Sequence, residues 1–158
     1  YALLGYSVYN WFKYYYIPLS FQGLILVIIT YLQHQDVDIE VYEPEEWQFV
    51  RGQTQTIDRK FGFGLDTLMH HITDGHVAHH FFFTKIPHYH LMDATEGIKK
   101  VLKPYENTPY GYKSESNYDF FFKFLHYNMK LDYLINKSKG VLQYRVGVEG
   151  EKAARKNH

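Results

Sequence analysis

Residues 14–35 read YYYIPLSFQGLILVIITYLQHQ, and this run decides the fold class because its 22 residues carry no charged side chain. Its centre, residues 23–32, consists almost wholly of Leu, Ile and Val. About 20 apolar residues of helix cross the hydrocarbon core of a bilayer, so we expect a transmembrane helix here, with the leading tyrosines in the headgroup layer. The alternative is a buried core helix of a soluble protein, because Pro18, Ser20 and Gln22 weaken the first turn.

The charges divide the chain into regions on either side of this run. Lys13 is the single charged residue in residues 1–35, whereas six acidic residues fall in residues 36–46. The sequence therefore predicts a transmembrane region over 1–35, a water-facing domain over 36–145 and a flexible tail over 146–158. Because the chain opens with Tyr1 inside an apolar stretch, we interpret residues 1–12 as the end of an earlier span and expect a C-terminal piece of a longer protein.

The water-facing domain is predicted to be all-α. Charge order, turn residues and apolar spacing indicate helices over residues 45–60, 65–71, 74–82, 93–102 and 118–135. The apolar stripe of the last helix belongs either to the core or to the membrane interface. The expected fold class is thus an all-α membrane protein fragment, with one transmembrane helix, or two if residues 1–12 form a span, and a helical cap.

The composition excludes several functional classes. The 17 basic and 17 acidic residues balance, so the chain lacks the surplus of Lys and Arg that holds a phosphate backbone, and we expect no nucleic acid partner. The chain contains no cysteine, which removes disulfides, zinc ribbons, iron-sulfur clusters and thiol nucleophiles. Nitrogen and oxygen are therefore the donors that a metal site in this chain can use.

Histidines concentrate in one segment of the chain. Seven of the ten histidines lie between residues 70 and 90. Among them, His76, His79 and His80 are spaced i, i+3 and i+4, which places three imidazoles on one face of a helix. Neutral imidazole binds iron, zinc, copper and nickel, so we predict a metal site here. The alternative is that these histidines are satisfied in an aromatic core or face solvent.

Three further residues are candidates for the same site. His34 follows the apolar run at the point where a span would emerge into water, and we predict it as a fourth ligand. Asp74 either caps the helix that carries His76 or accepts a hydrogen bond from the imidazole nitrogen that the metal does not use. His70 either lies beside the site and supports a ligand or is structural.

Several strings resemble one protein family. Ile72-Thr-Asp-Gly-His-Val-Ala-His-His80, followed by Pro87-His-Tyr-His90 and Ala94-Thr95, resembles the third histidine box of membrane-bound fatty acid desaturases. Thr30-Tyr-Leu-Gln-His34 resembles the exit of the family's last transmembrane helix, where a further histidine ligand stands. The similarity covers about residues 17–104 and is closest to methyl-end (delta-12 and omega-3) acyl-lipid desaturases, with nematode-like strings at residues 39–42, 51–56 and 140–144.

This resemblance implies an oxidoreductase of lipid metabolism that is a multi-pass protein of the endoplasmic reticulum membrane, with its histidine box facing the cytosol. It implies a centre of two iron ions, with His76, His79 and His80 as third-box ligands and His34 as the extra one. The implied partners are a fatty acyl lipid, O2, the bilayer, and cytochrome b5 with its NADH reductase as electron donors. The implied reaction introduces a double bond into an unsaturated fatty acyl chain.

The chain also departs from the family pattern. Glu40-Val41 stands where many plant and fungal relatives carry Pro-His, and residues 1–158 contain no first or second histidine box. Because four histidines cannot hold two irons by themselves, we predict that this chain alone is inactive and binds iron weakly. A hydroxylase, acetylenase or conjugase on the same scaffold stays open, as does a non-catalytic lipid-binding paralogue. A soluble zinc hydrolase is disfavoured, because the sequence nominates no general base or pocket for one.

Overall fold

A computed structural model describes residue 5 and residues 7–146 of the chain, so the predicted flexible tail lies almost wholly outside the described residues. The helices are α1 (Val8–Trp11), α2 (Ile17–His34), α3 (Phe49–Gln53), α4 (Leu65–Leu68), α5 (His76–Phe82), α6 (Leu91–Leu102) and α7 (Phe120–Lys130). The strands are β1 (Glu40–Tyr42), β2 (Asp58–Lys60), β3 (Ser114–Ser116), β4 (Leu131–Ser138) and β5 (Val141–Val146).

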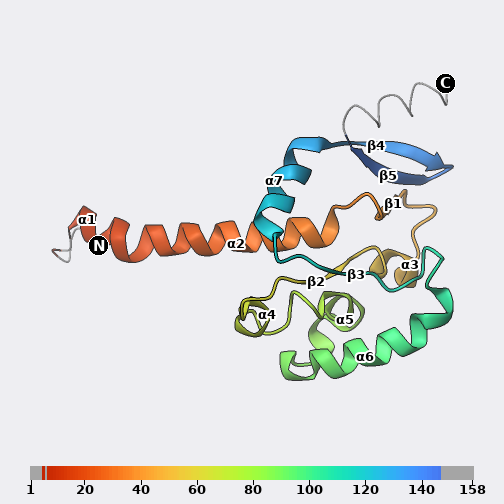
Figure 1. Ribbon diagram of the computed structural model, residues 1–158, viewed down its shortest axis with the longest axis horizontal. Helices are drawn as coiled ribbons and strands as arrows, with labels where there is room; N and C mark the ends of the chain where they lie inside the picture. The colour runs from red at the N-terminus through yellow and green to blue at the C-terminus, as the bar shows by residue number, and fades with distance from the viewer. Residues whose placement is uncertain (1–4, 6, 147–158) are drawn as a thin grey trace.

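The apolar run forms a long helix that projects from the rest of the chain (Figure 1). A π-helical turn joins α1 to α2, and the helix that results, Val8–His34, is long and apolar enough to cross a membrane by length and composition. Leu24 and Val27 near its centre are 47% and 54% exposed, which does not fit the alternative of a buried core helix. Residues 8–12 continue into the same helix, so they are not the end of a separate earlier span.

Only the last turns of α2 are buried. Ile28, Ile29 and Leu32 pack against Phe61, and side chains of α4 and α7 close the same cluster. A second cluster lies on the other side of α5, the helix that carries His76, His79 and His80. It is formed by side chains of α5 and α6 and contains Val77, Ala78, Leu91, Ile98 and Leu102. The histidines of α5 and the end of α2 therefore lie between two small apolar cores.

The expectation of an all-α fold is wrong in part, because the mostly helical chain also contains two small sheets. β1, β5 and β4 form an antiparallel sheet in that order, and β2 pairs in parallel with β3. The helix predicted over 118–135 ends at Lys130, where β4 begins. Lys139 and Gly140 form the two-residue connection from β4 to β5, and Gly140 takes a φ of +71° that glycine adopts without strain.

The helix predicted over 45–60 is also shorter than expected, since α3 covers five residues and is followed by a turn and β2. The polar residues after α3 bond to other segments instead of continuing the helix. The Gln55 side chain accepts a hydrogen bond from the Glu40 backbone N–H at 3.0 Å, and the Thr56 hydroxyl donates to the Gln33 carbonyl at 3.1 Å. These tertiary bonds compete with helical ones at residues that have only modest helix propensity.

The remaining predicted helices are present with altered ends. The prediction for 65–71 corresponds to the four-residue α4, because His70 and His71 adopt positive φ values of 53° and 60° and stop the helix. The predictions for 74–82 and 93–102 are confirmed by α5 and α6, which begin two residues later and two residues earlier, respectively.

Candidate metal site

Three histidine side chains from two helices converge on one point. His34 is the last residue of α2, whereas His76 and His80 lie one turn apart on α5. The Nε2 atom of His76 is 3.0 Å from Nε2 of His34 and 3.1 Å from Nε2 of His80. One ring nitrogen from each of the three residues falls within 4.8 Å of the other two.

This spacing suits a single metal ion. Imidazole nitrogens bind first-row metals at about 2.0–2.1 Å, so two ligands at right angles around one ion lie about 3 Å apart. The His34–His76 and His76–His80 separations of 3.0 and 3.1 Å agree with that value. Without an ion, a pair of facing nitrogens can share only one proton, which makes three convergent imidazoles an unfavourable way to pack a core. The donor set and its geometry therefore fit a metal.

The electrostatic environment keeps these imidazoles neutral, as metal binding requires. Burial, together with the neighbouring His80 and His34, lowers the pKa of His76 to about 2. Burial, together with the neighbouring His34 and His79, lowers the pKa of His80 to about 4. His76 is only 5% exposed, and its Nδ1 atom has no hydrogen-bond partner among the described residues. A neutral imidazole presents a lone pair to an ion at physiological pH.

A glutamine on α3 orients one of the three rings. The Oε1 atom of Gln53 lies 3.0 Å from Nδ1 of His80. Because an amide oxygen can only accept, this contact places the proton of a neutral His80 on Nδ1 and leaves the Nε2 lone pair facing the other histidines. Partners of this kind fix the tautomer and ring angle of a ligating histidine.

A second glutamine joins the end of α2 to the turn that precedes α5. The fully buried side chain of Gln33 donates from Nε2 to the carbonyls of Ile72 and Thr73, at 2.9 and 3.1 Å. Gln33 precedes His34, and the turn leads directly into His76. These two bonds therefore set the distance between the helix end that carries His34 and the helix that carries the other two histidines.

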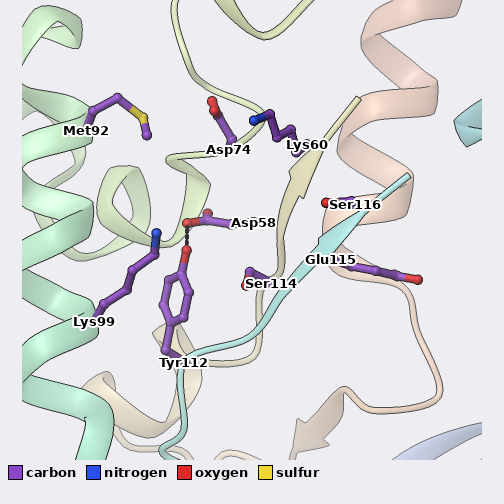
Figure 2. A pocket seen from close by; sticks show the side chains of 9 residues that line it. All are labelled: Asp58, Lys60, Asp74, Met92, Lys99, Tyr112, Ser114, Glu115 and Ser116. Atoms are coloured by element: carbon purple, nitrogen blue, oxygen red, sulfur yellow. Dashed lines mark hydrogen bonds between the residues drawn. The ribbon is translucent and has the colours of Figure 1, made fainter. Parts of the chain in front are cut away.

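The start of α5 is held by Asp58 of β2. Its Oδ1 atom accepts from the backbone N–H of Val77 at 2.7 Å, and its other oxygen accepts from the Tyr112 hydroxyl, a contact visible in Figure 2. A carboxylate at this position satisfies a free N–H group of the first helical turn and complements the helix dipole. Burial raises the pKa of Asp58 to about 6. The polar pocket drawn in Figure 2 is lined by Asp58 and Tyr112 but not by the three histidines.

The other predicted site residues take different places. The ring of His79 lies 5.7 Å from that of His76 and 5.9 Å from that of His80, outside the convergent group. Asp74 contacts Nδ1 of His71 at 3.0 Å, and the N-cap of α5 is Gly75, without a side-chain capping bond. Of the two alternatives for Asp74, capping of this helix is therefore wrong, and its support of a ligand stays a prediction.

His70 is not among the three residues whose nitrogens converge. Its ring lies next to the ring of His88, with the two rings tilted and their centroids 4.5 Å apart. Sequence reasoning missed the three residues that position the site, Gln33, Gln53 and Asp58. The adjacency of Gln33 to His34 was the one available signal, since buried polar partners are otherwise recognisable only from tertiary contacts.

Comparison with known proteins places the chain in a family. The family model described as fatty acid desaturase matches residues 1–114. The chain is 72% identical over 153 residues, or 97% of its length, to the Delta(12) fatty acid desaturase fat-2 of Caenorhabditis elegans. It is 68% identical over 147 residues, or 93% of its length, to the Omega-3 fatty acid desaturase fat-1 of the same organism.

A plant relative is more distant. The omega-6 fatty acid desaturase, endoplasmic reticulum, of Brassica juncea is 44% identical over 97 residues, which are 60% of this chain and 25% of that protein. The chain spans 41% and 36% of the lengths of the two nematode relatives. No solved structure matches the chain significantly.

Proposed function

The chain belongs to the fatty acid desaturase family, and from this premise we propose that it supplies part of the iron site of a membrane-bound acyl-lipid desaturase. The protein would introduce a double bond into an unsaturated fatty acyl chain, at the delta-12 or omega-3 position named for its two nematode relatives. The observation that carries the proposal is the convergence of the Nε2 atoms of His34, His76 and His80.

The residues present are compatible with iron as the bound metal. His34, His76 and His80 offer three neutral nitrogen donors. The chain has no cysteine, whose thiolate would favour a softer metal ion. His79, on the adjacent side of α5, is proposed as a ligand of the second iron, together with donors from elsewhere in the protein. When bound, a di-iron centre supplies the oxidising power needed to remove hydrogen from an unactivated methylene group.

The residues of this chain have defined tasks in that reaction. Gln53 keeps the Nε2 lone pair of His80 free for the metal, while Gln33 and Asp58 hold α2 and α5 at a fixed separation. The balanced reaction converts adjacent CH2 groups of the acyl chain and one O2, with two electrons and two protons, into a CH=CH unit and two waters. We propose cytochrome b5 and its NADH reductase as the electron source.

The proposed location is the endoplasmic reticulum membrane, as a multi-pass protein with the histidines on the cytosolic side. Two observations support this location. Val8–His34 is long and apolar enough to cross a bilayer, and His34 stands at its end. The Brassica juncea relative is named for the endoplasmic reticulum.

A chimeric enzyme tests this function directly. The matching segment of the Caenorhabditis elegans Delta(12) desaturase is replaced by this chain, and the chimera is expressed in a host that makes monounsaturated but no diunsaturated fatty acids. Gas chromatography with mass spectrometry of the fatty acid methyl esters should show new diunsaturated products. Feeding omega-6 substrates then separates delta-12 from omega-3 activity, and a hydroxylated or acetylenic product would identify a different reaction on the same scaffold.

Two variants of the chimera connect activity to the site. His76→Gln should abolish product formation, because it removes the most buried of the three converging imidazoles. His126→Gln changes an exposed histidine of α7 and should retain activity. A well-expressed chimera without product, or one that tolerates His76→Gln, would overturn the proposal.

A further inference from the structure

Helix α7 has two apolar faces, and only one of them packs against the rest of the described chain. On the inner face, the ring of Phe124 lies 5.2 Å from that of Tyr31 on α2, and the ring of Phe120 lies 5.0 Å from that of Phe61. The opposite side exposes four large apolar side chains, which are Phe121 at 44%, Phe122 at 72%, Leu125 at 40% and Met129 at 76%.

The exposed residues form a continuous stripe rather than a scatter. Positions 122, 125 and 129 are spaced i, i+3 and i+7, and position 121 lies one turn before 125, so all four share one side of the helix. With 3.6 residues per turn, this stripe is centred almost opposite the inner face. The sequence of α7 contains no acidic residue that would resist entry into an apolar phase.

The position of α7 relative to α2 suggests what covers the stripe. In Figure 1, α7 runs across the axis of α2 at the end where α2 enters the folded domain. If α2 crosses a bilayer along its axis, then α7 lies in the plane of the membrane surface. Its inner face contacts the last turns of α2, at Tyr31, which is the level at which a span leaves the hydrocarbon.

Exposed apolar residues also occur on the opposite side of α2. α4 lies across α2 from α7 in Figure 1, and Leu65 of α4 and Met69 just after it pack against the same cluster as α7. Leu68 at the end of α4 is 71% exposed, and the nearby Phe63 is 82% exposed. Apolar side chains thus flank the emerging helix on two sides, as expected of a surface that rests on lipid.

We propose that the stripe Phe121, Phe122, Leu125 and Met129 inserts into the interfacial region of the bilayer leaflet from which α2 emerges. The occupant of this surface is the lipid bilayer itself, because α7 lies at the depth and in the orientation of an interfacial amphipathic helix. The only charged residue of α7 before its last position, Lys123, turns inward to Glu115 and Asp36, which leaves the stripe uncharged. The proposal takes as its premise that α2 spans the membrane, part of the proposed location.

Site-directed spin labelling tests this proposal, since the chain contains no cysteine of its own. Single variants Phe122→Cys, Leu125→Cys and Met129→Cys are labelled after reconstitution into phosphatidylcholine nanodiscs. Power saturation compares the access of apolar O2 with that of a water-soluble nickel chelate. Leu24→Cys in the middle of α2 gives the depth reference, and Ser138→Cys at the end of β4 gives the aqueous reference.

The expected result is that labels at the three stripe positions contact O2 more than nickel, at a depth between those of the two references. Nickel access equal to that at residue 138, with residue 24 deep in the bilayer, would overturn the placement of α7 alone. Low access to both reagents would show that protein covers the stripe and would also overturn it. Nickel access at residue 24 would refute the spanning of α2 as well.

Discussion

Replacing Gln53 by leucine should weaken metal binding at the three-histidine site while leaving the fold intact. Gln53 is half-buried at the end of α3, and its described contact with the site is the one between Oε1 and Nδ1 of His80, at 3.0 Å. Leucine has a similar volume but no acceptor, so the change removes the group that fixes the proton on Nδ1. The Nε2 atom of His80 is then no longer held free for an ion.

The size of the effect follows from the chemistry of the hydrogen bond that leucine cannot form. A hydrogen bond between neutral groups contributes about 0.5–1.5 kcal/mol net. Removal of a residue that orients a ligating histidine typically weakens metal binding 10- to 100-fold, or about 1.4–2.7 kcal/mol. We therefore expect Gln53→Leu to lower metal affinity by a factor within that range. The unfolding free energy should change by less than about 1 kcal/mol.

Two matched variants separate orientation from simple disturbance of α3. In Gln53→Glu a carboxylate accepts from Nδ1, and because such charge-assisted bonds are roughly twice as strong, metal affinity should equal or exceed that of the parent chain. Gln48→Leu makes the same glutamine-to-leucine change at an exposed position before α3 and should leave affinity unchanged. Titration with Co2+, followed by its visible absorption in nanodiscs, measures all four proteins.

Two results would contradict this role of Gln53. If Gln53→Leu binds Co2+ within twofold of the parent chain, the contact with His80 has no role in metal binding. If Gln53→Glu loses as much affinity as Gln53→Leu, the side chain acts through packing and not through its acceptor oxygen. Circular dichroism of each variant shows that the helices are retained.

Three further predictions concern stability. Gln33→Leu leaves one buried and one part-buried carbonyl without their shared donor and should lower the unfolding free energy by about 2–4 kcal/mol, measured by thermal unfolding in micelles. Asp58→Ala should cost a similar amount because the Val77 N–H loses its acceptor, whereas Asp58→Asn, which keeps an acceptor, should lose less than half as much in the same assay. Burial lowers the pKa of Lys113 from 10.5 to about 8, so between these pH values the unfolded chain binds a proton that the folded chain does not. Stability should therefore rise by up to about 3 kcal/mol from pH 8 to 10.5, and Lys113→Met should flatten that rise in denaturant titrations.

The three converging histidines were predictable because their signal is local. His76 and His80 are one helical turn apart, and His34 directly follows an apolar run, so the sequence alone brings each to a defined position. The orientation of His79 was not predictable in this way. His79 and His80 lie three and four residues after His76, and both spacings place a side chain on the same helical face as His76. Only the position of α2 shows that His80, and not His79, converges with His34 and His76.

The fold was predictable where a single period continues. α6 repeats its apolar residues at helical spacing and ends before Pro104. The start predicted for this helix differs from the observed start by two residues. The segment over residues 118–135 changes from helical to strand period at Leu131, and an aromatic-rich sequence hides that change. β4 is formed because β5 lies beside it, which depends on the turn at Gly140 and not on β4 alone.

The three-histidine site and the depth of α2 are physically coupled. The guanidinium of Arg59, fully buried on β2, donates to the carbonyl of Leu32 at 2.5 Å and to the carboxylate of Asp36 at 2.5 Å, which flank His34 on either side. Separating a buried charge pair costs about 3–5 kcal/mol, so α2 cannot slide or rotate relative to the water-facing domain without that penalty. If α2 spans a bilayer as proposed, hydrophobic matching sets the level of α2, and the same contacts then set the level of His34. The point where the three histidines meet would thereby be held at a constant height above the hydrocarbon, as the proposed reaction at one position along a lipid chain requires.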